Sequence, residues 1–139
     1  MKILPLIFIT CIFSIACNNV SEKEYENSKE KMMEKEMRNP VDFLSVSHTG
    51  KRNLFGQTVV RGIIRSNASV SSYENVRVKM LYYNQEGALV ENHEEVIKGV
   101  IAPKSTLNFK AKYFTPKGTD SVALSIMEAD AIEDKDRKN

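Results

Sequence analysis

One stretch of the sequence holds side chains whose types and spacing can support chemistry. Glu91, His93 and Glu95 alternate along the chain, so a β-strand would place all three on one face. An imidazole between two carboxylates can bind a divalent metal weakly or assist proton transfer. The same pattern is typical of a solvated outer face on an edge strand, where charges discourage pairing with another chain. We favour this second interpretation, because no further ligand motif accompanies His93.

Other motifs for catalysis or metal binding are missing from the sequence. His48 lies far from His93 along the chain, at the start of a stretch, 48–55, that is predicted to be a polar loop. No serine lies in a Gly-x-Ser-x-Gly elbow, and there is no glycine-rich phosphate-binding loop. The two cysteines, Cys11 and Cys17, both precede the charged part of the chain, which therefore has no thiolate metal site or internal disulfide. We expect no catalytic residues, no metal and no cofactor, and a protein that is not an enzyme.

The elements that position these residues begin after an N-terminal targeting segment. Residues 1–16 combine Lys2 with the run Ile3 to Ile15, which is almost wholly apolar and contains no charge. Secretory signals have apolar regions of ~7–15 residues, whereas a membrane-spanning helix needs ~20. The segment is therefore predicted to be a signal peptide.

The end of that segment, Ser14-Ile15-Ala16-Cys17, resembles the lipobox of bacterial lipoproteins. The resemblance implies a diacylglycerol on the Cys17 thiol, cleavage after Ala16, and often a further fatty acid on the new amine. It also implies anchoring at the cell envelope, at the outer membrane on its periplasmic or surface face. Ser14 stands where leucine is usual in this motif. The alternatives are a general signal peptide with an incidental cysteine and a retained N-terminal helix.

A charged segment separates the lipobox from the rest of the chain. Residues 17–40 are rich in Glu and Lys and are predicted to be a solvated tether, partly helical or disordered. Glu34 and Arg38 have the favourable i, i+4 order of a helical ion pair. A partial apolar stripe of methionines at positions 32, 33 and 37 leaves open a short coiled coil or a partner-binding helix.

From Val41 onward, polar and apolar residues alternate with the period of a β-strand. The predicted strands are 43–47, 57–66, 76–83, 89–97, 107–113 and 122–126. The domain is predicted to span 41–130, followed by a charged tail over 131–139. Inward positions are assigned to Val78, Met80, Tyr82, Ile64, Phe109 and Leu124, and outward positions to Arg77 and Lys79. Short strands separated by turns predict a sandwich or barrel.

Three stretches between Val59 and Ala129 resemble the FxLYD-type domains of bacterial envelope proteins. They are Val60–Asn67, Val76–Gly87 and Ile101–Phe109. The resemblance implies an all-β, immunoglobulin-like β-sandwich of about six to seven strands, and it implies no catalytic residue. The chain departs from the family pattern at Asn84, where Asp is usual, and at Lys104, where Gly is usual.

The sequence as a whole therefore predicts a lipid-anchored envelope protein with a non-catalytic β-sandwich that binds a partner or has a structural role. Membrane contact is expected through the lipid on Cys17, and a protein or glycan is expected as the partner. The nearly balanced charge, 20 Lys and Arg against 18 Asp and Glu, argues against nucleic-acid binding. The alternative is an envelope enzyme or metal-binding protein with a site around His93.

Overall fold

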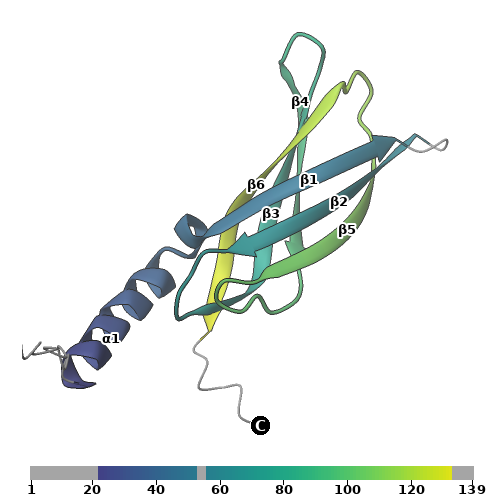
Figure 1. Cartoon of the computed structure of the whole chain (residues 1–139). Coiled ribbons are helices and arrows are strands. Elements are labelled where there is room, and N and C mark those ends of the chain that lie inside the picture. Colours follow the sequence, from purple (N-terminus) through teal and green to yellow (C-terminus); the bar gives the residue numbers. More distant parts are fainter. Residues whose placement is uncertain (1–21, 53–55, 133–139) are drawn as a thin grey trace, which may run out of the picture.

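The computed structural model describes residues 22–52 and 56–132 of the chain. A helix and a short 3-10 turn are followed by six β-strands in two facing antiparallel sheets (Figure 1). The elements are α1 (Glu22–Arg38), η1 (Pro40–Phe43), β1 (Leu44–Arg52), β2 (Gln57–Ser66), β3 (Ser72–Tyr83), β4 (Leu89–Ile97), β5 (Thr106–Phe114) and β6 (Ser121–Ile132).

The two sheets have the strand orders β1-β2-β5 and β4-β3-β6. We call them the first and the second sheet. If the six strands are named A, B, C, C′, E and F in chain order, as in immunoglobulin domains, the first sheet is A-B-E and the second is C′-C-F. The hairpin β1-β2 lies in one layer and the hairpin β3-β4 lies in the other. The predicted all-β, immunoglobulin-like sandwich is confirmed, with six strands.

Alternation along the central strands determines which side chains fill the space between the sheets. On β3, Val78, Met80 and Tyr82 are each 2% exposed or less, as the sequence predicted. Ile64 on β2 is fully buried opposite them. The two other predicted core residues, Phe109 and Leu124, are half-buried and pack against the core cluster that contains Ile64 and Val78.

Three strands extend at one end by four or more residues beyond the ranges that the sequence predicted. The stretch 48–55 was predicted to be a loop, but its first residues belong to β1, where His48 pairs with Gly62 and Gly50 with Val60. β3 begins at Ser72, and β6 continues to Ile132, because the two strands pair with each other there. In each case backbone hydrogen bonds to a neighbouring strand extend an element whose side chains have weak strand preference.

The segment predicted as a tether is a helix whose C-terminal end is docked on the sandwich. Most of α1 is solvated, and it projects from one end of the sandwich (Figure 1). The predicted i, i+4 pair forms, with 2.6 Å between Arg38 Nη2 and Glu34 Oε1, but both side chains are exposed and such pairs stabilise little. Glu36, however, is fully buried, so this end of the segment is not a solvated tether. No helix in the described parts of the chain has the length and apolarity needed to cross a membrane.

Candidate functional site

The sequence-predicted cluster of Glu91, His93 and Glu95 lies on β4, which is an edge strand of the second sheet. Its side chains share one face, as predicted, but that face is the inner one. Glu91 is paired with Tyr82 and Glu95 with Val78, both of which point into the core. The predicted outer-face position is therefore wrong, because the register with β3 directs these side chains toward the first sheet.

At this edge the two sheets are joined through Tyr113 of β5. Its hydroxyl donates a hydrogen bond to Glu95 Oε2, and its ring centroid lies 5.3 Å from that of His93 at an interplanar angle of 57°. Burial, followed by the charge of Glu91, raises the pKa of Tyr82 beneath them. These side chains line an open cavity of about 530 Å³.

The cluster does not form a metal centre. Among the described residues, no group of three His, Cys, Asp or Glu side chains is placed to hold a metal ion. Glu91 and His93 remain exposed on this inner face because β4 is an edge strand, while Glu95 is held by Tyr113. The arrangement offers carboxylates beside two aromatic rings, which can accept hydrogen bonds from a polar partner and pack against it.

The second histidine is a structural link rather than part of that cluster. His48 Nε2 lies 2.9 Å from the carbonyl oxygen of Val122 on β6. Because a carbonyl only accepts, Nε2 must carry the proton in this contact. β1 and β6 lie at the opposite edge of the sandwich from β4 and β5, so the structure does not bring His48 and His93 together.

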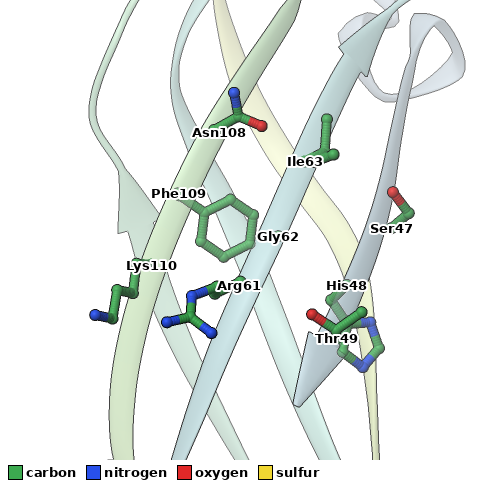
Figure 2. Close-up of a pocket in the computed structure, with 9 residues that line it drawn as sticks. All are labelled: Ser47, His48, Thr49, Arg61, Gly62, Ile63, Asn108, Phe109 and Lys110. Carbon is green, nitrogen blue, oxygen red and sulfur yellow. The ribbon is translucent and has the colours of Figure 1, made fainter. Parts of the chain in front are cut away.

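A second cavity, of about 640 Å³, opens on the first sheet around Gly62 (Figure 2). Gly62 pairs with His48 on one side and with Phe109 on the other. The Phe109 ring lies over this glycine, and a Cβ atom at position 62 would come within 2.2 Å of its Cζ atom. The lining residues are Ser47, His48, Thr49, Arg61, Gly62, Ile63, Asn108, Phe109 and Lys110.

Gly62→Ala should therefore lower the free energy of unfolding by about 1–3 kcal/mol, because the Phe109 ring must move to admit a methyl group. A denaturant melt measures the change. Gly50→Ala is the matched control on the neighbouring strand, where the added Cβ would meet only Thr58 Cγ2 at an ordinary 3.6 Å.

The loss of unfolding free energy caused by Gly62→Ala should be smaller in a Phe109→Leu background than in the wild type, since the smaller side chain leaves room for a methyl group at position 62. An undiminished loss in that background would show that ring contact is not its cause.

Sequence reasoning missed the buried carboxylate of Glu36. It accepts three backbone hydrogen bonds from the loop between β2 and β3: from Ser69 N to Oε1 at 2.5 Å, and from Val70 N and Ser71 N to Oε2 at 3.0 and 2.7 Å. We call this arrangement the Glu36 clamp. In addition, the Tyr73 hydroxyl donates to the Glu36 carbonyl oxygen at 3.2 Å.

The Glu36 clamp also shifts the acidity of the groups around it. Burial alone would raise the pKa of Glu36, but the hydrogen bonds from Ser69, Ser71 and Val70 together outweigh it and hold the pKa below its ordinary value of 4.5. Burial, followed by the charge of Glu36, raises the pKa of Tyr73 to about 12. In the sequence Glu36 is one of several glutamates in a Glu/Lys-rich run, so nothing local distinguishes it.

The predicted lipidation residue, Cys17, lies outside the described residues, as do the signal peptide and most of the predicted tail. Its role therefore stays a prediction from the sequence.

Comparison with known proteins gives structural neighbours only. The sequence matches no protein-family model, and no curated protein matches it. A solved structure of a DUF1425 family member from Shewanella sp. pv-4 is similar to this chain, with 20% identity and a TM-score of 0.45, covering 61% of this chain and 77% of that one. A structural-genomics target solved by X-ray crystallography is similar at 8% identity and a TM-score of 0.36, covering 67% of this chain and 88% of that one.

Proposed function

We propose that this chain is a lipid-anchored cell-envelope protein whose β-sandwich is a non-catalytic binding or structural module. The observation that supports this most strongly is the Glu36 clamp, which fixes the C-terminal end of α1 to the sandwich. α1 has 17 residues, so it is ~25 Å long at 1.5 Å per residue. A docked helix of this length keeps the sandwich at a defined distance and angle from the N-terminal end of α1.

The anchor in this proposal is Cys17, which precedes the start of α1 at Glu22 by only a few residues. The lipobox resemblance of Ser14 to Cys17 supports lipidation and with it an envelope location, which we assign to the outer membrane. A single acyl chain binds membranes only marginally, so stable anchoring requires the two or three chains that such a cysteine carries.

The partner in this proposal is a protein or glycan that binds at the β4 edge. An edge strand has unpaired backbone N–H and C=O groups, and a partner strand can hydrogen-bond to them and extend the sheet. Its apolar side chains Leu89 and Val96 are 52% and 39% exposed. On the face of this strand opposite Val96, His93 and Glu95 join Tyr113 of β5 in offering aromatic and carboxylate contacts. Partners that combine polar and apolar groups fit such a surface.

Lipid anchoring is tested by the intact mass of the protein recovered from the membrane fraction. We expect loss of residues 1–16 and the mass of lipid on Cys17. Cys17→Ser should abolish the lipid mass and block this cleavage, because the thiol is the attachment point. Cys11→Ser is the matched control: it changes the other cysteine, within the apolar run, and should leave lipid and cleavage unchanged. If Cys17→Ser protein were still cleaved after Ala16 and membrane-bound, the anchoring proposal would be wrong.

A further inference from the structure

The outer face of the first sheet is strongly cationic. Along β1, β2 and β5, every second side chain points to solvent. Where β2 pairs with β5, Arg61 lies beside Lys110 and Val59 lies beside Lys112. The lysines and arginines that this face exposes are Lys51, Arg61, Arg65, Lys110 and Lys112. No Asp or Glu occupies any described position of these three strands, on either face.

Within residues 22–52 and 56–132, these cations have no anionic partner, unlike Arg77 and Lys79 of the second sheet. On the second sheet, Arg77 Nε lies 3.2 Å from Glu128 Oε2, and Lys79 Nζ lies 3.4 Å from Glu94 Oε1. Among the described residues, none of the five basic side chains on the first sheet takes part in an ion pair. The chain has a net charge of only +2, so the positive potential is concentrated on one face.

The same face also exposes large apolar side chains. Ile63 is 42% exposed between Arg61 and Arg65, and Phe114 is 79% exposed at the end of β5. The cavity around Gly62 opens on this face, with Arg61 and Lys110 at its rim (Figure 2). A broad sheet surface with cations and exposed apolar groups suits a bilayer, since phosphates attract the cations and the interface admits the apolar groups.

We propose that the outer face of the first sheet docks on the surface of an anionic phospholipid bilayer. Basic side chains near such a surface are attracted to it over about a Debye length, ~8 Å at physiological salt. Docking would lay the sandwich on the membrane through β1, β2 and β5. The contact needs no acyl chain, so it goes beyond the proposed anchor on Cys17 and can fail or succeed independently of it.

The test uses the chain from residue 18 onward, which cannot be lipidated at Cys17 and retains every contact described above, all of which lie within residues 22–132. The protein is floated with vesicles of phosphatidylcholine, with or without phosphatidylglycerol. We expect binding only when phosphatidylglycerol is present, with affinity falling as salt rises. The double variant Arg61→Ala/Lys110→Ala should bind roughly 25-fold more weakly, at about five-fold per basic residue.

The matched control is Arg77→Ala/Lys79→Ala, which removes the same charge from the second sheet and should leave vesicle binding within about two-fold. Thermal melts establish that both double variants are folded. Equal loss in the two variants would show that net charge, not this face, drives binding, and would overturn the proposal. So would equal binding to both kinds of vesicle, no vesicle binding, or binding to an anionic oligosaccharide or oligonucleotide but not to vesicles.

Discussion

Glu36→Ala is expected to lower the free energy of unfolding by about 2–4 kcal/mol, measured by a denaturant melt at neutral pH. The variant leaves the N–H groups of Ser69, Val70 and Ser71 without their acceptor. A buried donor that loses its partner costs ~1–3 kcal/mol. The expected loss is smaller than the sum of three such costs, because the end of α1 can separate from the loop and let water bind the three N–H groups.

Glu34→Ala is the matched control for this change, two residues away on the same helix. Its carboxylate is exposed and paired only with Arg38, so the expected loss is about 0.5 kcal/mol or less. If Glu34→Ala were as damaging as Glu36→Ala, the loss would follow from removing any carboxylate of α1 rather than from the Glu36 clamp.

The stability difference between wild type and Glu36→Ala should also depend on pH. Because the folded pKa of Glu36 is lower than its ordinary value of 4.5, the carboxylate contributes its stability above pH 4.5. That contribution is lost as pH falls through the folded pKa, so the two proteins should converge in acid. A difference that stays constant on acidification would rule out a charged acceptor at position 36.

Ile64→Ala should lower the free energy of unfolding by about 2–5 kcal/mol, since it removes a fully buried side chain from between the sheets. Ile63→Ala removes the same atoms one residue earlier, on the outer face of β2, where the side chain is 42% exposed. Its expected cost is roughly 0.5 kcal/mol. Both values come from denaturant melts of the chain from residue 18 onward.

The pair of isoleucines tests the strand register directly. A slip of one residue along β2 would exchange the two faces, so the larger loss would move to Ile63→Ala. It would also turn Arg61 inward and Gly62 outward, which would remove both the cavity on the first sheet and its cationic rim.

The sequence by itself determined the all-β class and the inward face of the central strand β3. β2 and β4 begin and end where alternation and turn residues predicted. Gly87, in the turn between β3 and β4, has the positive φ of 77° that its position required. Every second side chain of β3 from Val76 to Tyr82 points inward, and the alternation of the sequence alone predicts this. These features depend on residues that are close along the chain, so local pattern is enough to predict them.

Only the tertiary structure decided which faces and loops those strands bring together. The inner position of His93 depends on its pairing with Met80, and the cationic face depends on pairing of β2 with β5, strands that are distant along the chain. The acceptor role of Glu36 depends on a loop more than 30 residues later, at Ser69 and beyond. A carboxylate or lysine has the same local preferences with or without such a partner, so its role becomes visible only when long-range packing supplies one.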